Sequence, residues 1–275
     1  MTPLKQILES ASVVLCLIFF AYISWSDYKT REVSNRVWIL FAPLAFALTF
    51  PALYLYEPSN VLFSYGISVG LTTAFAIVLF YAGGFGGADA KALMCLALAL
   101  PFYPENLLPE NLPISQQISP ISRILFPITV FSNAVVLVFV PVAYILLRNL
   151  YWRKKTGRKL FEEDHKNEVF WKKFLVLITG YKVSVNKLKE KWHLYPLEDI
   201  EENENESRRK LVIISRDENR NATVERLAKA VETGKIRDNV WASPGLPMLV
   251  FITAGLITAL FYGDIVWIFV RLFLG

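Results

Sequence analysis

Cysteine and histidine are scarce in this sequence, and neither is arranged to hold a metal ion. Two cysteines and two histidines occur among 275 residues. Cys16 and Cys95 both lie in apolar runs and form no Cys-x-x-Cys pair, so neither a structural zinc site nor a disulfide framework is expected. His165 and His193 lie apart, and we expect ordinary surface roles for both. We therefore predict no metal and no cofactor.

Basic residues are also scarce outside one segment. Of the 29 Lys and Arg residues, 22 lie between Arg148 and Arg237, and seven are left for the rest of the chain. The chain as a whole is 54% hydrophobic, with a mean hydropathy of +0.39. This partition is typical of a membrane protein with one soluble insertion. The insertion accounts for the pI near 9.1, so nucleic acid is not an expected partner.

Apolar runs are the most abundant feature, and six of them are candidates to cross a lipid bilayer. A bilayer core of about 30 Å requires roughly 20 apolar residues per helix. The fourth run is much shorter than this and must borrow residues from both ends. We therefore expect Asp89 and Lys91 in its first turn. The first run is followed by no clear small-residue cleavage site, so we interpret it as a retained span. The predicted spans are residues 8–25, 37–56, 61–82, 92–103, 124–147 and 246–274.

The predicted fold is a polytopic all-α membrane protein with six transmembrane helices. A small cytoplasmic α+β domain is inserted between the fifth and sixth helices. The corresponding domains are a membrane domain at 1–148, a soluble domain at 149–243 and the sixth helix at 244–275.

Within the insertion, hydrophobic periodicity predicts several local structures. Residues 170–175 alternate apolar residues with lysines and could lie on the membrane surface as a helix. Residues 211–214 are expected to form a short strand, and residues 223–236 an amphipathic helix. The acidic stretch 198–206 is expected to be a solvated loop.

The short loops predict how the chain is oriented in the membrane. Lys29, Arg31 and Arg36 follow the first span, and the loop after the second carries no basic residue. By the positive-inside rule, odd-numbered spans end in the cytoplasm, and both termini lie outside the cell. Asp27, Asp89 and the insertion then share the cytoplasmic face of the plasma membrane.

A glycine-rich segment leads into the fourth span and delivers an aspartate to it. Gly83, Gly84, Gly86 and Gly87 precede Ala88 and Asp89. Glycines lack a Cβ atom, so they let an extended substrate backbone approach closely, and their amides are available to pair with it. No Gly-Lys-Ser/Thr follows, so this is not a phosphate-binding loop.

Asp27 and Asp89 can supply the two carboxyls, one from each of two elements, that peptide hydrolysis by paired aspartates needs. Two carboxyls about 3 Å apart cannot both ionise, so one keeps a proton while the other takes a proton from the attacking water. Taken singly, Asp27 is more simply an interfacial residue, and the glycine turn is more simply a hinge. Asp264 lies near the middle of the last span, away from the cytoplasmic face, so we expect a polar packing role for it.

The two stretches combined resemble the prepilin peptidase family of GxGD-type membrane aspartic proteases. The resemblance rests on two motifs. They are residues 27–35 after the first span, and Gly86-Gly87-Ala88-Asp89 at the start of a later one. Residues 241–247 are similar to the archaeal preflagellin-peptidase branch. The resemblance covers residues 7–91 and those from 241 onward, and the insertion carries little of it. It implies catalytic roles for Asp27 and Asp89, and a substrate-binding or motif role for Asn35, Lys91 and the glycine segment.

The sequence departs from the family pattern at two points. Ala88 stands where the pattern has its second glycine. Alanine can replace glycine without strain only if the backbone φ at this position is negative. The four-cysteine loop of the bacterial branch is absent, so the resemblance implies a peptidase without N-methyltransferase activity. The implied substrates are preflagellins or pilin-like precursors with short basic leader peptides.

Three other functions fit some of these features. A presenilin-like intramembrane protease also uses paired aspartates, which would lie deeper in the spans. A proton-coupled transporter would place carboxylates near the middle of the bilayer. A non-enzymatic assembly protein would leave Asp27 and Asp89 as surface residues.

Overall fold

The computed structural model describes residues 3–104, 118–162, 165–166, 168–203, 206–212 and 220–274. The chain divides into two compact units. Met1–Val138 with Pro247–Gly275 forms the first, the membrane unit, and Phe139–Leu246 forms the second, the soluble-domain unit. The division falls inside a single helix, α6 (Phe126–Thr156). It therefore lies ahead of the predicted boundary at residue 149, and the predicted domain limits stay a prediction.

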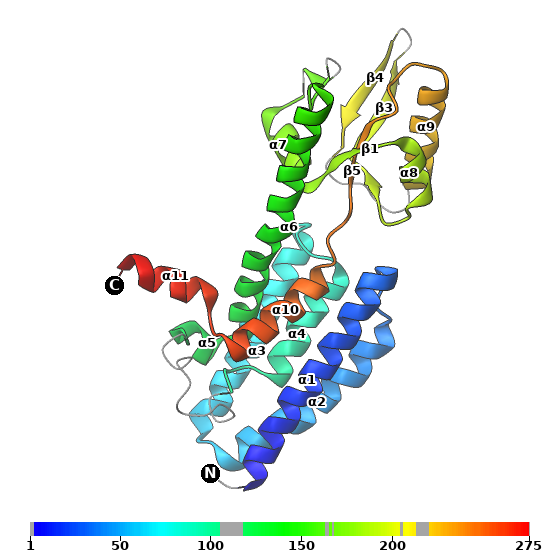
Figure 1. The fold of residues 1–275 in the computed structure, drawn as a ribbon. Helices are drawn as coiled ribbons and strands as arrows, with labels where there is room; N and C mark the ends of the chain where they lie inside the picture. The colour runs from blue at the N-terminus through cyan, green and yellow to red at the C-terminus, as the bar shows by residue number, and fades with distance from the viewer. Residues whose placement is uncertain are drawn as a thin grey trace. The chain divides into compact units, whose positions relative to one another are not determined.

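The membrane unit is built from helices that pack around α4. In this unit α1 packs against α2, α4 and α10, and α4 also packs against α2, α3 and α10 (Figure 1). The buried core contains large side chains from several helices, including Phe20, Phe41, Leu93 and Leu256. Its helices are α1 (Pro3–Thr30), α2 (Asn35–Tyr56), α3 (Ser59–Tyr81), α4 (Gly87–Ala99), α5 (Pro120–Ile124), the first part of α6, α10 (Met248–Phe261) and α11 (Ile265–Leu274).

Length and composition make the chain a multi-pass membrane protein. Among the described residues, α1, α2, α3 and α6 are each long and apolar enough to cross a bilayer. The pair α10 and α11 adds a fifth span if the two helices count as one, although they are bent by 60° at their break. The predicted continuous helix over 246–274 is therefore wrong, because residues 262–264 interrupt it. The fifth predicted span is longer than expected, since α6 extends to Thr156.

Helix α4 is too short to cross by itself, as the sequence indicates. Its 13 residues span about 20 Å at 1.5 Å per residue. Its last carbonyls have no partner within the helix and must find hydrogen bonds elsewhere. The Ala99 carbonyl accepts from Thr49 Oγ1 at 2.8 Å and Ser12 Oγ at 3.2 Å, and the Leu98 carbonyl accepts from Tyr65 Oη at 3.1 Å. Hydroxyls from α1, α2 and α3 thus let the helix end inside the bundle.

A single buried asparagine bridges the break between α10 and α11. Asn133 on α6 donates through Nδ2 to the Gly263 carbonyl at 2.9 Å, and its Oδ1 accepts from Ile265 N–H at 2.9 Å. Asp264 is buried, and its carboxylate accepts from Trp267 N–H at 3.1 Å, capping the first turn of α11. The predicted polar packing role of Asp264 is therefore confirmed.

The soluble-domain unit combines two small antiparallel sheets with short helices. In the first sheet the strand order is β1-β5-β2, with β5 at its centre, and β3 pairs with β4 in the second. Helices α8 and α9 pack together, and Leu188 and Leu227 are fully buried in the core beneath them. The elements are α7 (Phe170–Thr179), β1 (Tyr181–Val183), α8 (Val185–Glu190), β2 (Tyr195–Pro196), β3 (Glu198–Asn203), β4 (Glu206–Leu211), α9 (Arg220–Glu232) and β5 (Val240–Ser243).

Two of the predictions for the insertion hold, and one holds only in part. Helix α7 covers the predicted 170–175, and α9 covers most of the predicted 223–236. The strand predicted at 211–214 ends at Leu211 and begins at Glu206, while residues 213–214 lie outside the described residues. Whether α7 lies on a membrane stays a prediction.

The acidic stretch is the clearest error of the sequence interpretation. Residues 198–203 form strand β3 rather than a solvated loop, and Glu198 is completely buried. Its carboxylate accepts hydrogen bonds from Lys182 Nζ at 3.2 Å and from Arg209 Nε at 2.8 Å. Burial would raise the pKa of Glu198, but the charges of Lys182 and Arg209 outweigh burial and lower it. His165 is also completely buried, with Nε2 3.9 Å from Glu198, so its predicted surface role is wrong.

Candidate active site

Asp27 lies in the last turn of α1 and is half-buried. The chain turns sharply just after it. Arg31 adopts φ of 60°, and its N–H donates to the Asp27 carbonyl at 3.0 Å. Thr30 Oγ1 and Ser26 Oγ both donate to the Glu32 carbonyl, at 3.0 Å and 2.7 Å. A left-handed residue of this kind is a common way to end a helix, and it fixes the exit of the chain beside Asp27.

The beginning of α10 lies against the same turn of α1. Ser24 Oγ donates to the Leu249 carbonyl at 3.0 Å, and it lies 2.5 Å from Thr253 Oγ1. The Leu249 backbone N–H, one of the free amides at a helix start, faces the Asp27 carboxylate, as does the positive charge of Arg31. Asp27 Oδ2 is buried and has no hydrogen bond among the described residues. An acceptor oxygen in this state is available to a water or a substrate.

Asp89 lies in the first turn of α4, at the same end of the bundle as Asp27. Its Oδ2 accepts from Gly86 N–H at 3.0 Å, which caps the helix start. Because α1 and α4 pack together, the two carboxylates are close enough for the charge of Asp27 to act on Asp89. Two carboxylates that lie far apart in the sequence are thus brought to the same end of two packed helices.

The glycines ahead of Asp89 serve two different needs. Gly83 has φ of 75°, which most L-residues avoid, so a glycine suits the turn that ends α3. A Cβ atom at Gly86 would lie 3.2 Å from Asp89 Oδ2 and would crowd the capping carboxylate. Cβ atoms at Gly84 and Gly87 would meet only ordinary contacts, with Leu79 and Phe80 respectively.

Ala88, the departure from the family pattern, is accommodated without strain. It lies inside α4, and Arg31 is the one non-glycine residue with positive φ among the described residues. A right-handed helical position suits alanine better than glycine. The substitution therefore leaves the backbone that presents Asp89 intact.

Lys91 and Asn35 are brought together by the fold. Lys91 Nζ donates to Asn35 Oδ1 at 2.7 Å, across 56 positions of the sequence. The bond joins the fifth residue of α4 to the first residue of α2. It therefore links the segment that follows Asp27 to the helix that carries Asp89.

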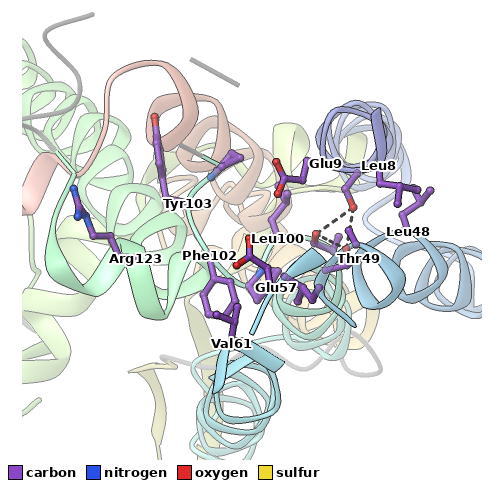
Figure 2. Close-up of a pocket in the computed structure, with 16 residues that line it drawn as sticks. Leu8, Glu9, Leu48, Thr49, Glu57, Val61, Leu100, Phe102, Tyr103 and Arg123 are labelled. Carbon is purple, nitrogen blue, oxygen red and sulfur yellow. Dashed lines mark hydrogen bonds between the residues drawn. The ribbon is translucent and has the colours of Figure 1, made fainter. Parts of the chain in front are cut away.

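A cavity of about 460 Å³ in the same unit lies away from both aspartates. Its walls come from the first part of α1, the last turns of α2, and the chain that follows α4 (Figure 2). Glu9, Thr49, Glu57 and Arg123 are among the side chains that line it. Because Asp27 and Asp89 lie at the opposite ends of α1 and α4, this cavity is not their substrate cleft.

Sequence reasoning missed Arg31 and Leu249, which face Asp27, and also Ser24 and Thr253, which join α1 to α10. Arg31 lies within the motif at residues 27–35, but the sequence alone indicates only that it belongs to a basic loop. The other three depend on the packing of α10 against α1, which local sequence does not reveal. The small hydroxyl residues at Ser24 and Thr253 are the one available signal, because such residues often mark close helix contacts in membranes.

Comparison with known families finds two that resemble this protein. A family model described as the type IV leader peptidase family matches residues 14–146, which include Asp27, Asp89 and their flanking segments. A second, described as Archaeal Peptidase A24 C-terminus Type II, matches residues 172–265. The chain is therefore similar to the type IV leader peptidase family over residues 14–146 and to the archaeal peptidase C-terminal model over residues 172–265. The second match lies largely in the insertion, so limiting the resemblance to residues 7–91 and 241 onward was wrong.

A relative with a stated activity matches nearly the whole chain. The preflagellin peptidase of Methanococcus voltae is 28% identical over 251 residues, which cover 88% of this chain and 90% of that protein.

Proposed function

We propose that the protein is a membrane aspartic endopeptidase that removes leader peptides by activating water between Asp27 and Asp89. The observation that carries this proposal is the pairing of the two carboxylates at one end of adjacent helices, with the charge of one acting on the other. Similarity to the type IV leader peptidase family supports a protease, and the two-aspartate mechanism is the chemistry that these residues allow.

The surroundings of the two carboxylates suggest their roles. Asp27 has a cation, Arg31, and the Leu249 N–H beside it, and both stabilise negative charge. Asp89 has one capping amide, from Gly86. We assign Asp27 as the base that takes a proton from the attacking water. Asp89 then carries the proton that polarises the scissile carbonyl and is passed to the leaving nitrogen.

The substrate class follows from the relative. Its name indicates action on preflagellin; we extend this to preflagellins or pilin-like precursors for this chain. Cleavage between a charged leader and an apolar helix needs carboxylates at the membrane boundary, and Asp27 in the last turn of α1 fits that depth. We place this boundary on the cytoplasmic face of the membrane, with the soluble domain on the same side and both termini outside the cell. In this topology α4 counts as one of six transmembrane crossings. We also propose that the protein lacks N-methyltransferase activity.

The position of the cut tests this function directly. The purified protein is incubated with a preflagellin in lipid vesicles, and the products are mapped by mass spectrometry. We expect one cut at the junction of the leader and the apolar helix. A cut inside the apolar helix contradicts the proposal and favours the intramembrane protease, and an intact precursor under all conditions favours a non-enzymatic role.

A further inference from the structure

A second cavity lies wholly inside the soluble-domain unit and is lined mainly by cations. Its volume is about 470 Å³, within the usual range for small-molecule sites. The residues that line it come from the segment after α6, from β4 and from the turn after α9. The lining residues are Arg158, Lys159, Glu162, Arg209, Gly234, Lys235, Ile236 and Arg237.

The floor of this cavity is a neutral, almost fully paired ion cluster. The Arg209 side chain is 1% exposed. It donates through Nη1 to Glu162 Oε2 at 3.0 Å, through Nη2 to the Asn239 carbonyl at 3.0 Å, and through Nε and Nη2 to Glu198. A guanidinium has five N–H donors, so one N–H on Nη1 has no acceptor among the described residues. The carboxylates of Glu162 and Glu198 already accept hydrogen bonds from Arg209.

The rim adds positive charge that this cluster does not neutralise. Arg158, Lys159 and Arg237 are exposed, and the structure gives their side-chain nitrogens no hydrogen bond or ion pair with a described residue. Lys235 completes the rim. Among the described residues, Arg158, Lys159 and Arg237 therefore place three exposed cations above a neutral floor, and the spare Arg209 N–H belongs to that floor.

The side chains that line the cavity limit the classes of ligand that it can bind. Arginine forks and lysine ammonium groups recognise multiply charged oxyanions. Among the described residues that line the cavity there is no aromatic side chain, so they offer no platform on which a nucleobase could stack. Ile236 is the one large apolar side chain among the described lining residues, which leave little to hold an apolar peptide.

We infer that this cavity, the basic pocket, binds a phosphate-bearing anion through Arg158, Lys159, Lys235 and Arg237, above the Arg209 guanidinium. The phosphate comes either from a soluble polyphosphate or from an anionic lipid headgroup, since clusters of cations after a membrane helix attract anionic lipids. This inference is independent of the proposed peptidase activity.

Binding of tripolyphosphate to the full-length protein tests the pocket. Titration calorimetry is performed on protein in phosphatidylcholine nanodiscs at about 0.1 M salt, where exposed charges are screened beyond about 10 Å. We expect R158Q/R237Q to weaken binding at least about tenfold, a change of roughly 1.4 kcal/mol. The matched control is K187Q/K191Q, which removes two exposed cations from α8 and its cap outside the pocket. It should retain the affinity of the wild-type protein.

The lipid source is tested in a second arm by native mass spectrometry of protein released from mixed phosphatidylcholine and phosphatidylglycerol nanodiscs. Phosphatidylglycerol carried by the wild type and by K187Q/K191Q, but not by R158Q/R237Q, supports a headgroup ligand. Binding of neither anion overturns the inference. So does binding that R158Q/R237Q leaves intact, or that both double variants weaken equally.

Discussion

The Lys91 ammonium group donates to the Asn35 side chain at 2.7 Å and ties the start of α4 to the start of α2. Both side chains are exposed, so the bond adds little to the free energy of unfolding, about 1 kcal/mol or less. The importance of the Lys91–Asn35 hydrogen bond lies in the segments that it connects. Asp89 is in the same turn of α4 as Lys91, and Asn35 ends the short segment that begins at Asp27.

Replacement of Lys91 by methionine therefore separates activity from stability. We expect K91M to slow leader cleavage severalfold, because the segment between Asp27 and α2 loses its tie to α4, while the thermal unfolding midpoint changes little. Lys91→Arg retains a donor and should restore part of the rate. Equal rates for K91M and the wild type would show that the contact does not position the site.

Ala88→Gly tests whether the family's second glycine is needed for backbone conformation. Ala88 is helical, so glycine should destabilise α4 by about 1 kcal/mol or less and leave the cleavage rate within about twofold. The unfolding midpoint and the initial cleavage rate are measured side by side. A large gain in rate with A88G would mean that the active conformation requires positive φ at this position.

Asn133→Leu removes both hydrogen bonds that bridge the break between α10 and α11. The Gly263 carbonyl and the Ile265 N–H then lose their partners, and each unsatisfied buried group costs about 1–3 kcal/mol. We expect a lower unfolding midpoint in detergent. Ser132→Ala, which removes a hydroxyl from the adjacent position on the same helix, is the control, and a loss as large as that of N133L would contradict the explanation.

Glu198→Gln removes the one carboxylate between Lys182 and Arg209. Loss of one partner of a buried ion pair costs about 3–5 kcal/mol, so hydrogen exchange at the amides of β1 and β5 should accelerate strongly. Glu225→Gln on the exposed face of α9 should leave this exchange unchanged. Unaltered exchange in E198Q would show that the cluster does not hold the two sheets together.

The same carboxylate predicts how this unit responds to acid. The folded-state pKa of Glu198 is below its ordinary value of 4.5. Its contribution to stability is therefore fully present above about 4.5 and is lost as the pH falls through the lower folded-state value. Exchange in β5 should accelerate below that pH in the wild-type protein and depend less on acid in E198Q.

Local sequence was sufficient for the long helices and for the candidate site. Apolar runs located α1, α2 and α3 closely, and the motif residues indicated Asp27 and Asp89. The sequence also singled out Asn35 and Lys91, although not their contact, because a pair 56 positions apart leaves no local pattern.

The errors share a physical cause, which is compensation by distant residues. Gly263 and Asp264 break the last span at a point where Asn133, on another helix, supplies two hydrogen bonds to the backbone. Glu198 belongs to an acidic run that predicts solvation, yet Lys182 and Arg209 arrive from other strands and permit its burial. Neither partner can be inferred from hydrophobic periodicity.

Cleavage by single aspartate variants is the most direct test of the two-aspartate mechanism. Asp27→Asn and Asp89→Asn each keep the shape of the side chain but cannot share the catalytic proton. Loss of general acid–base catalysis should lower preflagellin cleavage by at least about a hundredfold. Asp264→Asn is the matched control, because asparagine also caps a helix, and it should cleave like the wild type. If D27N or D89N, correctly folded, still cleaves at the wild-type rate, the pair is not the catalytic site.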